Sequence, residues 1–201
     1  MEKKSIFKRI KDYFQKQKTA QKILFSLFKG TRKAIGVRQG KGKGDVKEWA
    51  AVVKEGKIMF EGKNLLDETI MGIRESGVSY IPEDRLTTGV ATKVSIWENL
   101  VSDRIDKKEL REKKLLSQKK IKDMSQQLIK DYTILCRNEN QEVGMLSGGN
   151  MQKVVIAREF SFDADVYVVA QPTRGVDIGA KKEIYNVINR MAAQGTAIIM
   201  V

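Results

Sequence analysis

The stretch Leu146–Lys153 reads LSGGNMQK, and further along the chain the stretch Gln171–Asp177 reads QPTRGVD. Ser147 and two glycines form a small-residue turn that opens an apolar helical run ending at Phe160. Such a turn exposes backbone N–H groups at the positive end of a helix dipole and therefore suits a phosphate. Taken alone, the turn fits a serine N-cap with turn glycines better than a phosphate site. The ordered pair of motifs, with the apolar strand Val166–Val169 between them, reverses that weighting in favour of a phosphate site.

The whole pattern resembles the ATP-binding subunits of ABC transporters and is closest to the importers of simple sugars and nucleosides. The resemblance runs from about residue 57 to residue 201. In that family the signature motif holds the γ-phosphate of an ATP bound on the opposite domain of a dimer, and the matching residues are Ser147, Gly148, Gly149, Asn150 and Gln152. Asp177 matches the D-loop, which crosses the same interface. Glu83, in the stretch GVSYIPEDR, stands where most ABC ATPases carry Gln.

Two catalytic motifs of this family are not intact in the chain. A P-loop needs Gly-x-x-x-x-Gly-Lys-Ser/Thr, whose amides, lysine and hydroxyl hold the phosphates and Mg²⁺. No such string occurs, and the nearest one is GKGKGD at Gly40–Asp45. It is more typical of a flexible basic linker, and a decayed P-loop is the alternative. The Walker B acids are replaced by Ala170 and Gln171. Because phosphoryl transfer needs a positioned metal and water, no intact catalytic residue and no metal site are expected, and the question of enzymatic activity stays open.

We therefore expect an α/β fold, a P-loop NTPase-like ABC ATPase domain with a helical subdomain, incomplete at both ends because Walker A and the switch His are missing. The composition contains no His at all. Residues 1–54 would be an N-terminal segment and linker, and residues 55–201 a partial second nucleotide-binding domain with its helical subdomain at about 95–145. The chain stops inside the apolar run Ala197–Val201, which reads as a buried strand of a fragment with an aggregation-prone bare edge.

Local patterns predict strands alternating with helices, and hence a parallel sheet. Asp67 is expected to cap a short helix that ends at Glu75. Arg158 and Glu159 are expected to make surface contacts, while Arg174 either pairs with Asp177 or has a plain surface role. Strands are expected at 57–61, 78–81, 166–169 and 197–201, with a turn at Gly62–Asn64 after the first. Further helices are expected at 95–101, 106–134, 151–160 and 180–193.

The net charge of +13 is concentrated at the N-terminus, where residues 1–54 carry sixteen Lys/Arg and four Asp/Glu. Apolar residues from Ile6 to Phe28 recur at helical spacing between these cations. Three interpretations stay open: a solvated tail, a basic amphipathic helix that contacts an anionic membrane or a permease, and a less favoured nucleic-acid contact. No secretory signal and no long apolar run occurs in the chain. The single Cys136 is expected to pack as a small apolar side chain.

The resemblance implies ATP as the cofactor, with Mg²⁺ in intact relatives. It also implies a second nucleotide-binding domain and transmembrane permease subunits as partners, and a peripheral place on the cytoplasmic side of the cell membrane. Nucleic acid is an unlikely partner on this interpretation. The alternative is a non-catalytic remnant or interaction module derived from such a subunit.

Overall fold

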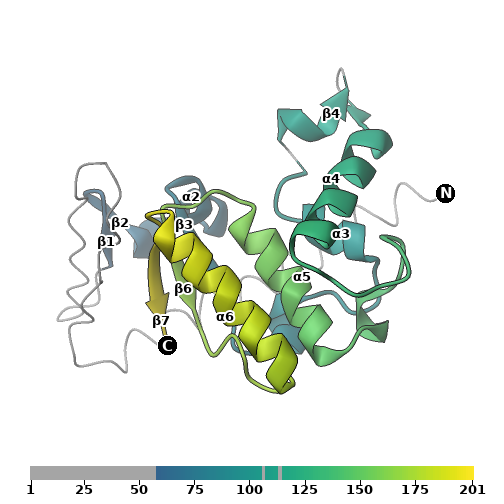
Figure 1. Ribbon diagram of the computed structural model, residues 1–201. Helices are drawn as coiled ribbons and strands as arrows, with labels where there is room; N and C mark the ends of the chain where they lie inside the picture. Colours follow the sequence, from purple (N-terminus) through teal and green to yellow (C-terminus); the bar gives the residue numbers. More distant parts are fainter. Residues whose placement is uncertain (1–57, 106, 113–114) are drawn as a thin grey trace.

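The computed structural model describes residues 58–105, 107–112 and 115–201. The expectations for the basic segment at residues 1–54 and for the GKGKGD stretch therefore lie outside the described residues. Within the described part, short parallel strands and helices alternate as the sequence predicts (Figure 1).

A three-stranded parallel sheet forms the base of the fold. It consists of β3 (Val78–Ile81), β6 (Val166–Val169) and β7 (Ala197–Met200) in the order β3-β6-β7. Val166 is the partner of Val78 on one side and of Ala197 on the other, so β6 is the central strand. All four β6 residues are buried, which agrees with the continuous apolar run expected of a central parallel strand. The predicted α/β class and parallel sheet are confirmed.

Two long helices connect the sheet to the rest of the domain. Helix α5 (Gly148–Phe160) follows the N-cap Ser147, and helix α6 (Ile178–Ala193) follows the N-cap Asp177. Helix α5 contacts β3 on one side and the helices α3 (Ile96–Val101) and α4 (Gln118–Asp131) on the other, and Figure 1 shows it between these two parts. The signature motif thus begins a helix that packs against both halves of the fold, which are the sheet and the α3–α4 part.

The predicted helical arm at 106–134 is wrong in its first half. Helix α3 (Ile96–Val101) lies where a helix is expected, and a full capping box between Ser95 and Glu98 forms its start. After it comes a two-stranded antiparallel pair, β4 (Arg111–Glu112) and β5 (Leu115–Leu116). Helix α4 (Gln118–Asp131) begins only afterwards, because the Ser117 hydroxyl accepts from the Lys120 N–H and caps it.

The first described elements also differ in detail from their prediction. Strands β1 (Met59–Phe60) and β2 (Lys63–Asn64) pair in a hairpin, and Glu61 and Gly62 both have positive φ, at 46° and 77°. Lys63 and Asn64 therefore belong to a strand rather than to a turn. Helix α2 (Ile70–Glu75) is capped by Thr69, whose hydroxyl accepts from the Gly72 N–H at 3.0 Å. The carboxylate of Asp67, the predicted cap, accepts instead from the Asn64 side chain.

The remaining elements of the described residues are short helical turns. They are 3-10 turns at Leu65–Asp67, Lys108–Leu110 and Val143–Met145, and a π-helical turn at Arg85–Gly89.

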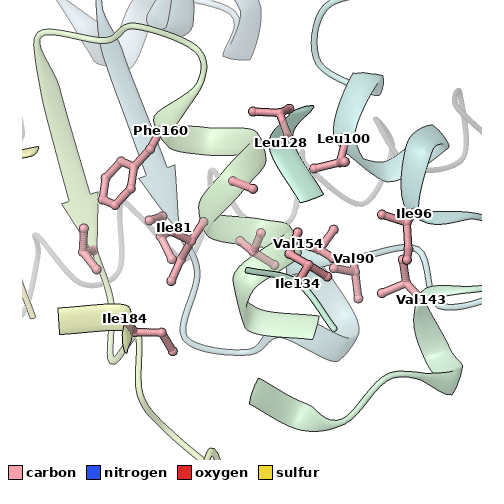
Figure 2. Close-up of a cluster of buried hydrophobic side chains, with 14 of the residues drawn as sticks. Ile81, Val90, Ile96, Leu100, Leu128, Ile134, Val143, Val154, Phe160 and Ile184 are labelled. Atoms are coloured by element: carbon pink, nitrogen blue, oxygen red, sulfur yellow. The ribbon is translucent and has the colours of Figure 1, made fainter. Parts of the chain in front are cut away.

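One apolar cluster joins the sheet to the α3–α4 part. Figure 2 shows side chains from the sheet, from α5 and α6, and from the α3–α4 part meeting in this cluster. Cys136 packs against it at half-burial, as predicted. Members that are fully buried include Ile81, Ile96, Leu100, Val143 and Val154. Because these residues come from the sheet and from the α3–α4 part, this cluster is common to both.

A buried ionic cluster lies at the C-terminal end of α5. Arg158 and Glu159 are each only 1% exposed, so the expectation of surface contacts is wrong. The Glu159 carboxylate accepts from Arg74 Nη1 at 2.8 Å, from Ser79 Oγ at 2.6 Å and from Arg158 Nε at 2.9 Å. Sequence pattern suggested a solvated charged pair, but these partners come from distant segments that only the fold brings together.

The cluster extends from α5 toward the α3–α4 part. Asp103 accepts from Arg74 Nη2 at 2.6 Å and from Arg104 Nε at 2.9 Å. Arg104 in turn donates to the Arg158 carbonyl at 2.6 Å and to the Ser161 carbonyl at 3.0 Å, at the end of α5. A cation at a helix C-terminus is favourable because the last carbonyls carry the negative end of the dipole. The cluster therefore links the C-terminal end of α5 by hydrogen bonds to the sheet side and to the α3–α4 part.

Candidate functional site at the signature turn

The signature turn is held in place by Asn150. Asn150 donates from Nδ2 to Ser147 Oγ at 3.0 Å and from its backbone N–H to the same oxygen at 3.4 Å. Its side-chain oxygen accepts from the Leu135 N–H at 2.9 Å. Because Ser147 Oγ accepts twice, its own O–H is directed away from Asn150, and the Ser147 side chain is exposed.

Backbone donors lie beside this hydroxyl. The first helical bond of α5 runs from the Met151 N–H to the Ser147 carbonyl at 2.9 Å. The N–H groups of Gly148 and Gly149 precede that bond and have no partner within the helix. A hydroxyl donor and two amides at a helix N-terminus suit a phosphate oxygen. The turn therefore fits the role that the resemblance assigns to it.

Contacts within the chain leave little space beside the two signature glycines. A Cβ on Gly149 would lie 2.6 Å from the Ala180 Cβ and 3.1 Å from Asp177 Oδ2. A Cβ on Gly148 would lie 2.7 Å from Arg85 Nη2 and 3.1 Å from the Gly175 carbonyl oxygen. The signature turn thus packs against the turn at 174–177, and little space remains there for a side chain on Gly148 or Gly149.

Asp177 acts as the N-cap of α6 in this packing. Its Oδ1 accepts from the Ala180 N–H at 2.9 Å. The backbone hydrogen bond from Ala180 is the main reason why the pKa of the Asp177 carboxyl is lowered. Asp177 is exposed and lies next to Gly149, so the structure brings the two predicted motifs onto one surface.

The two residues predicted to stand at degenerate Walker B positions lie at the carboxyl end of the central strand. Ala170 is 1% exposed, and its N–H donates to the Ile81 carbonyl at 2.9 Å. Gln171 is exposed with φ of 41°, and its N–H donates to the Val201 carbonyl. No group of three or more His, Cys, Asp or Glu side chains that could hold a metal occurs among the described residues. The residues at this strand end do not fit Mg²⁺, because neither supplies a carboxylate.

Glu83 is occupied by an ion pair that the sequence did not predict. Its carboxylate accepts from Arg174, so the expected pairing of Arg174 with Asp177 is wrong, whereas the alternative of a surface role agrees with the exposure of Arg174. Arg85, two residues later, donates from Nη1 to the Arg174 carbonyl at 2.7 Å and from Nη2 to the Gly175 carbonyl at 3.0 Å. A hollow of about 290 Å³ lies here, lined by Glu83, Asp84, Arg85, Leu86, Arg174 and Gly175.

Gln152 is buried, whereas Ser147 of the same motif is exposed. Its side chain is 2% exposed, and its Nε2 has no hydrogen-bond partner among the described residues. Lys153 is also buried, donates to the Thr133 carbonyl at 2.8 Å and pairs with Glu183. Burial removes both side chains from the surface that Ser147 presents.

The described residues have the fold of an ABC ATPase cassette. The chain is similar to the dimeric structure of an ATP-binding cassette bound to ADP and phosphate in a post-hydrolysis state, with a TM-score of 0.59 and 18% identity, over 74% of this chain and 62% of that one. A dimeric bacterial ABC transporter cassette gives a TM-score of 0.60 at 19% identity and the same coverage.

By sequence, the chain is similar to ATP-binding proteins of sugar import. It is 33% identical to the ribose import ATP-binding protein of Shouchella clausii over 90% of this chain and 36% of that protein. It is 34% identical to the galactose/methyl galactoside import ATP-binding protein of Haemophilus influenzae over 92% of this chain and 37% of that protein. The xylose import ATP-binding protein of Thermoanaerobacter pseudethanolicus is 36% identical over 74% of this chain and 29% of that protein. The chain spans about a third of the length of these relatives.

A family model also matches the first part of the chain. Residues 3–74 match ribosomal protein L16p/L10e, which is less than half of the chain. Only the last residues of this match, from β1 to α2, are among the described ones. No helix in the described ranges is both long enough and apolar enough to cross a membrane.

Proposed function

We propose that the chain is a non-hydrolysing nucleotide-binding partner in an ATP-driven importer of simple sugars. Its signature turn would complete an ATP site on a second nucleotide-binding domain. The observation that carries this proposal is the exposed Ser147 hydroxyl beside the Gly148 and Gly149 amides, packed directly against the turn at Gly175–Asp177. Sugars are preferred to nucleosides because ribose, galactose and xylose are named for the relatives.

Each residue of the turn has a separate task in this proposal. Ser147 and the amides of Gly148 and Gly149 donate to the terminal phosphate of ATP held by the partner. Asn150 contacts no phosphate and instead fixes the Ser147 rotamer through its 3.0 Å hydrogen bond. Asp177 lies at the same surface and contacts the partner domain. Gln152 is left out of the phosphate contact because it is buried.

The partner supplies what this chain lacks. Mg²⁺ placement and water activation need carboxylates, and the strand end here offers Ala170 and Gln171. The partner's own P-loop would hold ATP and Mg²⁺. The α3–α4 part would contact the transmembrane permease, so the chain would lie peripherally on the cytoplasmic side of the membrane.

Nucleotide-dependent association tests this proposal. The full chain is mixed with a sugar-importer nucleotide-binding domain that has an intact P-loop and Gln for its catalytic Glu, so that ATP stays bound. Sedimentation should show a heterodimer with Mg-ATP but not with ADP. Ser147→Arg should abolish it, because the arginine occupies the phosphate position. Gln127→Arg adds the same charge to an exposed α4 position and should leave it unchanged. Equal association with ATP and ADP would contradict the proposal.

A second candidate function concerns the N-terminal part. The match of residues 3–74 to a ribosomal protein, together with the sixteen Lys/Arg in residues 1–54, favours contact with ribosomal particles over contact with a membrane for this segment. Neutralisation of phosphates by cations gives binding that weakens steeply with salt and does not need an apolar face.

Co-sedimentation of the full chain distinguishes ribosome binding from membrane binding by the N-terminal segment. We expect the chain to pellet with ribosomes at low salt, to be released by salt, and to keep this binding in Phe14→Ser and Leu24→Ser. A membrane-surface helix would instead bind anionic vesicles and lose that binding in the same two variants, because its apolar face must be buried. Pelleting with vesicles alone would refute the ribosomal candidate.

A further inference from the structure

Arg85 connects three segments that are far apart in the sequence. It belongs to the loop that follows β3, and it donates to the carbonyls of Arg174 and Gly175 across 89 and 90 residues of chain. Its Nη2 is also next to Gly148, because a Cβ placed on Gly148 would lie only 2.7 Å from this nitrogen. The guanidinium therefore lies between the turn at 174–177 and the first residue of the signature helix.

The position of Arg85 is itself fixed by its own loop. The preceding Asp84 caps the π-helical turn, accepting from the Leu86 N–H at 2.9 Å and from the Thr87 hydroxyl at 2.7 Å. The Thr87 hydroxyl hydrogen bond is the main reason why the pKa of the Asp84 carboxyl is lowered. The arginine therefore extends from a loop whose start is closed by hydrogen bonds, which limits where its guanidinium can lie.

The contact uses a property that only arginine has among the cationic side chains. The planar fork presents two N–H donors at a fixed spacing, which matches two successive carbonyls, whereas the lysine ammonium is a single point donor. The positive φ of Gly175, at 63°, is part of the turn that presents these carbonyls to the guanidinium.

We infer that Arg85 is a positioning residue that holds the signature turn and the 174–177 turn in one arrangement. This inference rests on the proposed function, because it states how the two turns come to face the same partner. Arg85 touches no phosphate in this account. It acts through Gly148 and Gly175, whose relative placement decides whether Ser147 and Asp177 contact the partner together.

The neighbouring Arg174–Glu83 pair provides a matched comparison. The Arg174 side chain is 62% exposed and the Glu83 side chain 31% exposed. An ion pair at such exposure is screened by solvent and contributes little. The Arg85 fork instead joins the backbone of the 174–177 turn directly. If only a positive charge near this loop mattered, removal of Arg85 and removal of Arg174 would change hydrogen exchange and association by similar amounts.

Two measurements test the inference on the full chain. In the first, hydrogen exchange of the free chain is followed over peptides covering residues 147–150 and 172–177. We expect Arg85→Ala to speed exchange at both turns by about tenfold or more, since two charge-assisted hydrogen bonds are lost. Arg85→Lys should restore only part of the protection. Arg174→Ala and the exposed Arg137→Ala should leave both turns unchanged.

The second measurement is Mg-ATP-dependent association with the P-loop partner described above. Arg85→Ala should weaken it by about tenfold or more, and Arg85→Lys by an intermediate factor. Normal association and unchanged exchange in Arg85→Ala, with Ser147→Arg still defective, would overturn the inference and leave the proposed function intact. If the unaltered chain fails to associate, the proposed function fails. Faster exchange at both turns in the free Arg85→Ala chain would then still support the positioning role, and unchanged exchange would overturn it.

Discussion

The 201-residue chain, incubated alone with Mg-ATP, is expected to release no phosphate above the protein-free control. It has Ala170 and Gln171 at the end of the central strand, and no P-loop string anywhere in its sequence. Metal placement, phosphate binding and water activation each contribute orders of magnitude to phosphoryl transfer. A coupled phosphate-release assay measures this directly. A turnover in the ordinary range of about 1 s⁻¹ or more that is abolished by Ser147→Arg would show that the chain holds a complete site of its own.

Replacing Glu159 with Gln is expected to lower the free energy of unfolding by about 3–5 kcal/mol, the usual cost of breaking a buried ion pair. Glu159 is 1% exposed and accepts from Arg74, Arg158 and Ser79. The substitution keeps the shape of the side chain but leaves two buried guanidinium groups without this counter-charge. Urea unfolding measures the difference. The exposed Glu112→Gln should change stability by about 1 kcal/mol or less, and an equal effect of the two substitutions would refute the role of the cluster.

The same carboxylate makes stability depend on acid. Burial alone would raise its pKa, but Arg74, Arg158 and the Ser79 hydroxyl outweigh burial and lower the pKa of Glu159 from 4.5 to about 2. A lowered folded-state pKa gives stability that is fully present above pH 4.5 and is lost as the pH falls toward about 2. The difference in unfolding free energy between the unaltered chain and Glu159→Gln should therefore shrink over this window. A difference that stays constant from pH 5 to about 2 would contradict the stated cause.

The sequence predicted elements well where a local pattern and a cap agree. The Ser147 turn, the apolar strand at 166–169 and the short helix that begins after Ser95 each carry their signal within a few residues. The same local reasoning placed the cap of α2 at Asp67, although Thr69 lies nearer to the helix and takes that role. Two possible caps close together cannot be ranked without knowing where each side chain finds its other partners.

What the sequence could not supply was the set of long-range polar partners. Glu159 and Arg74 are 85 residues apart, and Arg85 and Gly175 are 90 residues apart. Nothing in the spacing of charges marks Arg158 and Glu159 as buried, because a charged pair at the end of an apolar helix also suits a solvated surface. The match to the family pattern included Arg85 without giving it a role. Its contacts are to backbone carbonyls, and because every residue carries a carbonyl, no residue type in the sequence indicates such a contact.

In the proposed function, the signature turn contacts the terminal phosphate of ATP bound to another domain. A photoreactive group attached to the γ-phosphate of ATP tests this contact most directly. With the P-loop partner present, labelling should occur on this chain within residues 147–150. It should disappear in Ser147→Arg and remain in Gln127→Arg. Equal labelling without the partner, or labelling confined to other parts of the chain, would contradict the claim.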